Sequence, residues 1–217
     1  MNEVFPNRIG DYEILGVLGR GGMGVVFEAQ HAELPRTVAL KLIKGSVSVA
    51  RARFKREGEL LARVRHPNVI GVHELGETPE GPYLVTDRID GKSLKDEHEQ
   101  TPFEPKRAAA VLRDLAGAVA ALHAAGVVHR DLKPENVIVR TSDGVPILID
   151  FGLAFSEDCE RLTRTGALVG TPFFMAPEQM VGGEFDERVD VYGLGAVLYA
   201  LLCGHAPFAD SDSMHSL

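Results

Sequence analysis

Runs of alternating hydrophobic and polar residues fill most of the chain up to about residue 90. This alternation is typical of β-strands, and turn signals separate the runs. The predicted strands are Tyr12–Leu18, Val25–Gln30, Thr37–Ile43, Gly71–Leu75 and Tyr83–Ile89. One stretch differs: from about Val49 to Val64, apolar residues recur every three or four positions, which predicts a helix. The helix should end by His66-Pro67, because proline disfavours a helical residue before it.

From Gly91 onward the pattern changes and favours helices. Ser93 is a candidate N-cap, and Pro105–Ala125 is an alanine-rich stretch that Gly126 should end. Its apolar stripe consists of Val111, Leu115, Val119 and Leu122. Short strands are predicted at Val127–Val128, Val137–Val139 and Ile147–Ile149, and a buried apolar helix at Val189–Cys203. The chain is therefore expected to be an α+β protein with a β-rich part at 9–90 and a mainly helical part at 91–217.

A long irregular stretch, Phe151–Ala176, precedes the last helix. Loops of that length inside compact domains are usually functional or disordered. The sequence contains no internal repeat and no low-complexity tract.

The composition fits a globular protein and limits the classes of partner. With 217 residues, the chain can form one large domain or two small lobes. A net charge of −8 argues against a general nucleic-acid or anionic-membrane binder, which needs a basic surface. The two cysteines, Cys159 and Cys203, fit neither a disulfide framework nor a zinc site, so a cytoplasmic location is expected. The apolar run Val191–Cys203 is interrupted by glycines and falls short of the ~18 residues that suggest a membrane span.

The segment Gly19-Arg20-Gly21-Gly22-Met23-Gly24 has a glycine spacing that lets a backbone approach phosphates closely. A dinucleotide-binding turn of this kind should open a helix and be followed about 20 residues later by an acidic residue. Here a β-like run follows, and Lys41 stands at that distance. The loop therefore joins two strands, and taken alone it is equally compatible with a plain glycine-rich hairpin.

Lys41 ends the apolar strand Val38-Ala39-Leu40-Lys41. A surface lysine at a strand edge is one interpretation. A lysine beside a glycine-rich loop is also what a phosphate clamp requires. Glu57 lies on the apolar face of the predicted helix, where it suits a buried partner for Lys41 better than a solvated charge.

A carboxylate, a cation and an amide occur together in the string His129-Arg130-Asp131-Leu132-Lys133-Pro134-Glu135-Asn136. Asp150-Phe151-Gly152 follows an apolar strand. A base for a hydroxyl proton and two oxygen ligands for magnesium are the parts that phosphoryl transfer needs. Each string alone is common by chance, whereas all of them in this order and spacing are not.

On these motifs the sequence resembles the eukaryotic-like protein kinases, from about Ile9 to its last residues, and looks most like the bacterial serine/threonine kinases. The resemblance implies a two-lobed fold with a β-rich N-lobe, one key helix and a mainly helical C-lobe. It also implies ATP and Mg²⁺, or Mn²⁺ in its place, as cofactors. Family members continue past Pro207-Phe208 with further helices, so the chain is expected to be a C-terminally truncated kinase domain.

The resemblance also implies roles for individual residues. Asp131 would accept the substrate proton, Lys133 would neutralise the γ-phosphate, and Lys41 would hold the α- and β-phosphates and pair with Glu57. Asn136 and Asp150 would bind the metal. The remaining nucleotide-binding residues would be the loop Gly19, Arg20, Gly21, Gly22, Met23 and Gly24, the adenine contacts Val26 and Ala39, the gatekeeper Thr86, the hinge residues Asp87 and Ile89, and Ile138.

Lys133 and Thr171 match the serine/threonine pattern, so protein substrates with Ser or Thr hydroxyls are expected. Asp190 matches the residue that braces the catalytic loop in the family, and Gly193 departs from the usual serine or alanine. Autophosphorylation at Thr163 or Thr165 is expected, with one copy of the chain phosphorylating another in a transient homodimer. A pseudokinase that only binds nucleotide and a dinucleotide-dependent oxidoreductase are the alternative functions.

Overall fold

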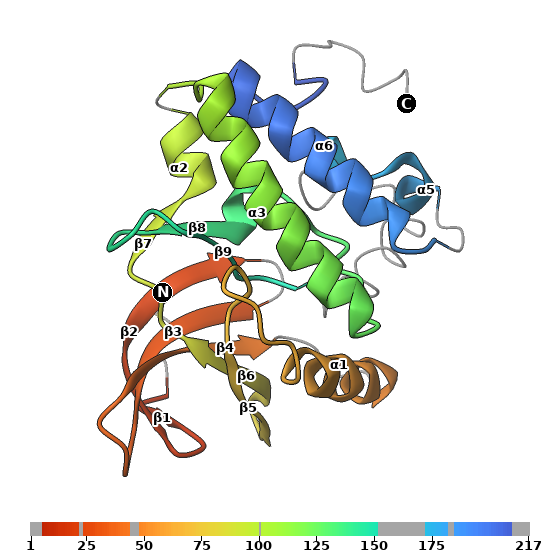
Figure 1. Ribbon diagram of the computed structural model, residues 1–217. Coiled ribbons are helices and arrows are strands. Elements are labelled where there is room, and N and C mark those ends of the chain that lie inside the picture. Colours follow the sequence, from red (N-terminus) through yellow and green to blue (C-terminus); the bar gives the residue numbers. More distant parts are fainter. Residues whose placement is uncertain are drawn as a thin grey trace. The chain divides into compact units, whose positions relative to one another are not determined.

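The computed structural model describes residues 6–21, 24–43, 48–99, 101–151, 172–181 and 185–209, with the side chains of 48–53 excepted (Figure 1). The chain divides into two compact units. The N-terminal unit comprises Met1–Arg65 and Ile70–Ile89, and the C-terminal unit comprises His66–Val69 and Asp90–Leu217. The short segment His66–Val69 joins the second unit because Asn68 O accepts a hydrogen bond from Leu148 N at 2.9 Å and Val69 forms a β-bridge with Leu148.

A six-stranded antiparallel sheet forms the N-terminal unit, in the order β1-β2-β3-β4-β6-β5. The strands are β1 Arg8–Ile9, β2 Tyr12–Gly21, β3 Gly24–His31, β4 Thr37–Ile43, β5 Val72–Thr78 and β6 Gly81–Asp87. All five predicted strands are confirmed, although Ile89 lies beyond the end of β6. The two-residue β1 was not predicted, because it is too short for an alternating pattern.

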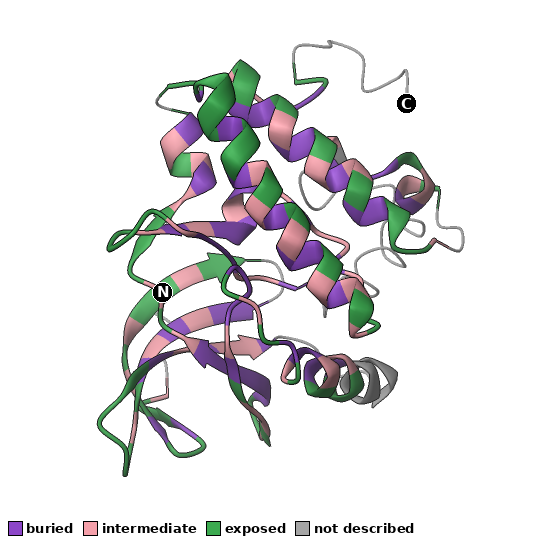
Figure 2. Cartoon of the chain, viewed as in Figure 1, coloured by how far each residue is buried: buried purple, intermediate pink, exposed green. Residues whose placement is uncertain are grey.

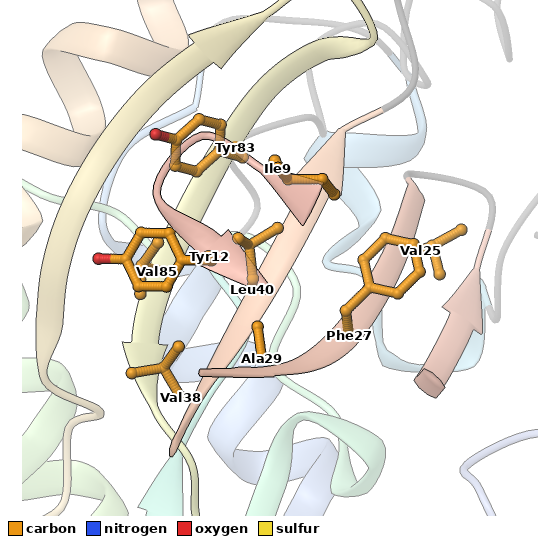
Figure 3. Close-up of a cluster of buried hydrophobic side chains, with 9 residues drawn as sticks. All are labelled: Ile9, Tyr12, Val25, Phe27, Ala29, Val38, Leu40, Tyr83 and Val85. Atoms are coloured by element: carbon orange, nitrogen blue, oxygen red, sulfur yellow. The ribbon is translucent and has the colours of Figure 1, made fainter. Parts of the chain in front are cut away.

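One face of this sheet carries the core of the unit, and the register shows why (Figure 3). Phe27 lies opposite Leu40, and Leu40 lies opposite Val85, so these side chains point to the same face. The buried cluster on that face consists of Ile9, Tyr12, Val25, Phe27, Ala29, Val38, Leu40, Tyr83 and Val85. The residues between them in β3 and β4 point to the opposite face, since side chains alternate along a strand.

A single carboxylate, that of Glu74 in β5, pairs with two tyrosines at the edge of the core cluster. Tyr12 donates to Glu74 Oε2 and Tyr83 donates to Glu74 Oε1, both at 2.8 Å. Tyr12 is fully buried and Tyr83 is 5% exposed. Burial, and then the neighbouring Glu74 carboxylate, raise the pKa of both tyrosine hydroxyls above the ordinary value. Both hydroxyls therefore stay protonated and serve as donors.

Helix α1, Ser48–Leu61, packs on β5. The approach is close: a Cβ on Gly58 would lie 2.1 Å from Leu75 Cδ2. The helix ends three residues before the predicted end at Val64. Backbone bonds of the shorter i→i−3 type, Arg63 N to Leu60 O and Val64 N to Leu61 O, tighten the chain there.

In the C-terminal unit, a three-stranded sheet has the order β7-β8-β9, with β7 Gly91–Ser93, β8 Val137–Arg140 and β9 Pro146–Leu148. Ser93 caps helix α2, Leu94–His98, by accepting a hydrogen bond from Asp96 N at 3.1 Å, as predicted. The prediction of a strand at Val127–Val128 is wrong. Those residues follow the helix end at Gly126, whose φ is +75°, and Val127 N bonds back to Leu122 O.

The long helices α3, Pro105–Ala124, and α6, Arg188–Cys203, lie side by side (Figure 1). The predicted apolar stripe of α3 is buried (Figure 2). The 3₁₀ turns η1, Pro134–Asn136, and η2, Pro172–Phe174, and the short helix α5, Pro177–Met180, complete the described elements. Within the described part of the chain, no helix has the length and apolar character needed to cross a membrane.

Replacing Glu74 by alanine should destabilise the chain by about 2–4 kcal/mol, because two buried tyrosine hydroxyls would lose their acceptor. The urea midpoint measures this. Glu80→Ala is the matched control, since Glu80 is exposed in the turn between β5 and β6 and should leave the midpoint nearly unchanged. Equal midpoints for the two variants would show that the tyrosine pair does not depend on Glu74.

Candidate active site

In the N-terminal unit, the register brings most of the predicted nucleotide-binding residues to one face of the sheet. Gly19 lies opposite Val26, Val26 lies opposite Lys41, and Ala39 lies opposite Thr86. Directly opposed residues share a face, and this face is the one that does not carry the core cluster. Val26, Ala39 and Lys41 are half-buried there, so the side chains line a surface rather than fill the interior.

The glycines of the loop differ in what they require. Gly24 has a φ of +150°, and a Cβ on it would lie 2.0 Å from Leu42 O, so the fold itself demands glycine there. A Cβ on Gly19 or Gly21 would meet nothing within 4 Å among the described atoms. Packing does not explain those two glycines, and the predicted approach of phosphates to the backbone, which stays a prediction, would explain them. Arg20 is exposed in β2, and Gly22 and Met23 lie outside the described residues.

Lys41 and helix α1 lie on the same side of the sheet. Lys41 and Leu75 both lie opposite Leu84, and Leu75 is the residue on which Gly58 of α1 packs. Glu57, the neighbour of Gly58, is half-buried. The architecture is therefore compatible with the predicted Lys41–Glu57 pair, which stays a prediction.

The end of β6 is held by side-chain bonds. The Thr86 hydroxyl donates to Asp87 O at 3.3 Å and to Ala39 O at 3.5 Å. The Asp87 carboxylate accepts from Gly71 N at 3.1 Å and pairs with His73 Nε2 at 2.8 Å. The side chain of Asp87 is thus turned to Gly71 and to His73 of β5. Its backbone carbonyl accepts from Thr86 with one lone pair and has a second lone pair for the predicted contact with a base. Ile89, two residues on, is the last residue of the unit.

In the C-terminal unit, three of the predicted residues meet around one carboxylate. Lys133 Nζ donates to Asp131 Oδ1 at 2.9 Å and to Oδ2 at 2.8 Å. Asn136 Nδ2 donates to Asp131 O at 2.7 Å and to Oδ2 at 2.9 Å. The turn η1 makes this possible, because it folds Asn136 back onto the residue five positions earlier. The three side chains form one polar cluster that is largely shielded from solvent.

Asp190, at the start of α6, holds the backbone of this loop. Its Oδ2 accepts from His129 N at 2.8 Å and from His123 Nε2 at 2.7 Å, and its Oδ1 accepts from Arg130 N at 2.8 Å. Asp190 is 1% exposed. A buried carboxylate is costly unless it is hydrogen-bonded, and these three donors supply the compensation. His123, in the last turn of α3, was not predicted, since no motif marks it in the sequence.

The side chain of His129 is hydrogen-bonded to the backbone N–H of Asp131. It is fully buried, and its ring lies 5.4 Å from that of Phe151. Burial lowers the pKa of the His129 imidazole below its ordinary value, so the ring is neutral near pH 7. Its Nδ1 accepts a hydrogen bond from Asp131 N at 3.3 Å.

Two oxygen-bearing side chains, Asn136 and Asp150, are candidates for a metal. Ile149 N donates to Asn136 O at 2.9 Å, which brings the residue after Ile149, Asp150, next to the turn. Asn136 bonds to Asp131 through Nδ2, so these bonds do not use its oxygen atom, Oδ1. No cluster of three or more His, Cys, Asp or Glu side chains suited to a metal occurs among the described residues. Two oxygen ligands with phosphates and water suit Mg²⁺ rather than a dedicated protein cage. Ile138 is half-buried in β8, two residues beyond Asn136.

Close packing explains why position 193 is occupied by glycine, and the sequence did not reveal this. It lies one turn after Asp190 on α6, and a Cβ there would be 2.8 Å from Leu132 Cβ. The absence of a side chain therefore lets α6 approach the loop at Leu132. The departure from the usual serine or alanine at position 193 thus goes with close packing on Leu132.

Gln179 of α5 also bonds to the loop and was not predicted. It donates to Arg130 O at 2.9 Å and accepts from Ala176 N at 3.0 Å. A glutamine three residues after a helix start is a known capping signal, so the second bond could have been predicted, but not the first. Thr163, Thr165, Gly152 and Thr171 lie outside the described residues.

A glycine-rich hairpin on an antiparallel sheet, together with a helical unit that carries an Asp–Lys–Asn loop, defines the protein kinase fold. The chain belongs to the protein kinase family: residues 12–217 match the family model described as the protein kinase domain. The predicted fold and the predicted resemblance to bacterial serine/threonine kinases are both confirmed.

Among individual proteins, the chain is similar to the serine/threonine-protein kinase PknD of Mycobacterium tuberculosis, with 44% identity over 100% of this chain and 33% of that protein. PknH of Mycobacterium bovis is 40% identical over 97% of this chain and 37% of that protein. The chain thus spans about a third of the length of these curated relatives.

Solved structures agree with this assignment. The PknI kinase domain of Mycobacterium tuberculosis matches 92% of this chain and 77% of that chain, with a TM-score of 0.77 and 28% identity. The structure of Rad53 1–466 in complex with AMP-PNP matches 94% of this chain and 51% of that chain, with a TM-score of 0.77 and 27% identity.

Replacing Gly193 by alanine should lower stability relative to Gly195→Ala. Both changes gain the ~1 kcal/mol of helix propensity that alanine has over glycine, but only the first forces a Cβ against Leu132. Overpacking typically costs ~1–3 kcal/mol. Gly195 is exposed, and a Cβ on it would meet nothing within 4 Å. Urea midpoints compare the pair, and a Gly193→Ala midpoint as high as that of Gly195→Ala would refute the close packing.

Proposed function

We propose that this chain is the catalytic domain of an ATP-dependent serine/threonine protein kinase. It transfers the γ-phosphate of ATP to Ser or Thr hydroxyls of protein substrates. The observation that carries the proposal is the Asp131–Lys133–Asn136 cluster, in which a carboxylate, a cation and an amide meet on a braced loop. The family match and the names of the similar bacterial kinases support the substrate class.

In this proposal the hydroxyl oxygen of the substrate attacks the γ-phosphorus of ATP, and ADP departs. Asp131 accepts the proton that this hydroxyl loses. Lys133 donates to both oxygens of Asp131 and so fixes the orientation of the carboxylate that would act as the base. Each carboxylate oxygen has two lone pairs, so a position for the substrate proton remains. Lys133 also supplies positive charge where the transferred phosphoryl group carries negative charge.

Asn136 and Asp150 would hold the magnesium ion. When bound, magnesium neutralises phosphate charge, which is a large part of catalysis in phosphoryl transfer. The chain's own contribution is to orient the two ligands. Asn136 is fixed by its two bonds to Asp131, and Asp150 lies two residues after the end of β9.

The nucleotide would bind on the face of the N-terminal sheet that carries Gly19, Val26, Ala39, Lys41 and Thr86. Apolar side chains of Val26 and Ala39 suit the flat faces of adenine, and Lys41 suits the α- and β-phosphates. The Rad53 structure, which matches 94% of this chain, was solved in complex with AMP-PNP, an ATP analogue.

Asp131→Asn should lower phosphate transfer by about 10²–10⁴-fold, the usual contribution of a general base, while leaving nucleotide binding largely intact. Lys41→Met should also abolish transfer, but by misplacing the triphosphate. Peptide phosphorylation and a thermal shift with Mg-ATP, Mg-ADP and NAD measure the two effects. Asp143→Asn and Lys92→Met are the matched controls, since both residues are exposed.

The outcomes separate the candidate functions. Near-normal turnover by Asp131→Asn would remove Asp131 from its role. A shift with Mg-ATP without any phosphate transfer by the wild-type chain would favour the pseudokinase. A shift with NAD alone would favour the oxidoreductase.

We further propose that the kinase autophosphorylates at Thr163 or Thr165, in a transient homodimer. Arg130 directly precedes Asp131, and a phosphothreonine, with close to two negative charges, could pair with its guanidinium and order the loop.

After incubation with Mg-ATP, mass spectrometry should find phosphate on Thr163 or Thr165. The double alanine variant should lose most of its peptide activity, because the ordering anion is missing, whereas Thr141→Ala in an exposed turn should not. The Asp131→Asn chain should incorporate about 10²–10⁴-fold less phosphate, which excludes a contaminating kinase. Full activity of the double variant would contradict the proposal.

A further inference from the structure

The amide of Gln179 joins α5 to the loop that carries Asp131. Gln179 is 4% exposed. Its Oε1 accepts from Ala176 N at 3.0 Å, which closes the start of α5. Its Nε2 donates to Arg130 O at 2.9 Å, a bond between residues 49 positions apart in sequence. The first bond is local and structural, whereas the second reaches the residue before Asp131.

Arg130 has an uncommon backbone conformation that this bond helps to hold. Its φ is +69°, a left-handed value that non-glycine residues rarely adopt and that costs free energy. Such conformations persist when the surroundings over-determine them. Here the backbone N–H of Arg130 donates to Asp190 Oδ1 at 2.8 Å, and its carbonyl accepts from Gln179. Two side chains from two helices thus clamp both polar backbone groups of Arg130.

The clamped carbonyl belongs to the peptide unit that leads into Asp131. The N–H of the same unit donates to His129 Nδ1 at 3.3 Å. Both ends of this unit are therefore oriented, and its plane sets the direction in which the Asp131 side chain leaves the backbone. Asp190, the residue that matches the family's brace, instead orients the two preceding peptide units through His129 N and Arg130 N.

We infer that Gln179 is a positioning residue for Asp131. Through its bond to Arg130 O, Gln179 couples the segment Pro172–Val181 to the loop 129–136 that carries Asp131. The inference rests on the proposed kinase function. If the orientation of Asp131 depends on this bond, removing the Nε2 donor should lower kcat and leave the KM for ATP unchanged. The two hydrogen bonds that the variant loses go to Ala176 and Arg130, and neither is a predicted nucleotide-binding residue.

Gln179→Met keeps the length and the apolar bulk of the side chain but loses both hydrogen bonds. We expect kcat for a peptide substrate to fall about tenfold or more, since small misplacements of reacting groups can cost up to ~10²-fold. Val111→Ala is the control for a general loss of stability. Val111 is buried in the first half of α3, well away along the helix from His123. At a temperature where both variants are folded, Val111→Ala should keep the wild-type kcat.

Gln179→Glu provides a test that a purely structural role would not pass. A protonated glutamic acid can accept from Ala176 N and donate to Arg130 O, as glutamine does, whereas the ionised form offers no donor. Burial raises the pKa of a carboxyl, so this switch should occur within a usable range, between about pH 5.5 and 8. Gln179 bonds to the loop 129–136 and lies in α5. The titratable or charged groups on these two segments are His129, Arg130, Asp131, Lys133, Glu135 and Glu178, and Asp190 bonds to the same loop.

The measured quantity is the ratio of the variant's kcat to that of the wild type at each pH, which cancels titrations common to both. For Gln179→Glu the ratio should rise as the pH falls, and for Gln179→Met it should stay low and flat. A flat ratio near one for both variants would overturn the inference. A low, flat ratio for Gln179→Glu would also overturn it, because restoring the donor would then restore nothing.

Hydrogen exchange of the loop distinguishes this inference from the proposed function. The amides of His129, Arg130 and Asp131 are all hydrogen-bonded. Gln179→Met should speed their exchange at least tenfold relative to Val111→Ala. If the wild-type chain phosphorylated no peptide while this exchange difference appeared, the kinase proposal would fail and the coupling would stand. Unchanged exchange would refute the coupling whatever the activity.

Discussion

The arrangement of the C-terminal unit depends on the hydrogen bonds that the carboxylate of Asp190 accepts. This carboxylate is buried, and it accepts hydrogen bonds from the backbone of His129 and Arg130 and from the side chain of His123. Because an unpaired charge in the interior is very costly, the three donors cannot move away without destabilising the unit. The helices α3 and α6 and the catalytic loop are thus held in one arrangement. The loop then needs only local bonds, from His129 and η1, to gather Asp131, Lys133 and Asn136.

In the N-terminal unit the equivalent constraint is the register of the sheet. Since side chains alternate along each strand, the residues that fill the core commit their neighbours to the other face. A slip of one residue would bury Lys41 and expose Leu40. The same logic separates two uses of glycine in one loop. Gly24 is required by contact with Leu42 O, whereas Gly19 and Gly21 have open space where side chains would be.

Most elements could be predicted from the sequence, because alternation and helical periodicity report on burial directly. The failures have physical causes. Val127–Val128 is apolar enough for a strand, but the backbone turns at Gly126 and bonds to α3 instead. The motifs of the candidate site stand out because their residues lie close together in sequence. His123 and Gln179 do not stand out, since each acts on a segment far away in the chain. Gly193 was recognised as unusual, but its reason, contact with Leu132, exists only in three dimensions.

The catalytic loop is held mainly through its backbone rather than through the side chains that would react. Asp190 binds two N–H groups and Gln179 binds one carbonyl. Backbone groups are present whatever the side chain, so this clamping leaves Asp131, Lys133 and Asn136 available for chemistry. It also explains how Arg130 can keep a left-handed φ of +69° without being glycine. Hydrogen bonds from Asp190 in α6 and Gln179 in α5 stabilise this conformation, so the geometry of the loop depends on residues that lie far from it in the sequence.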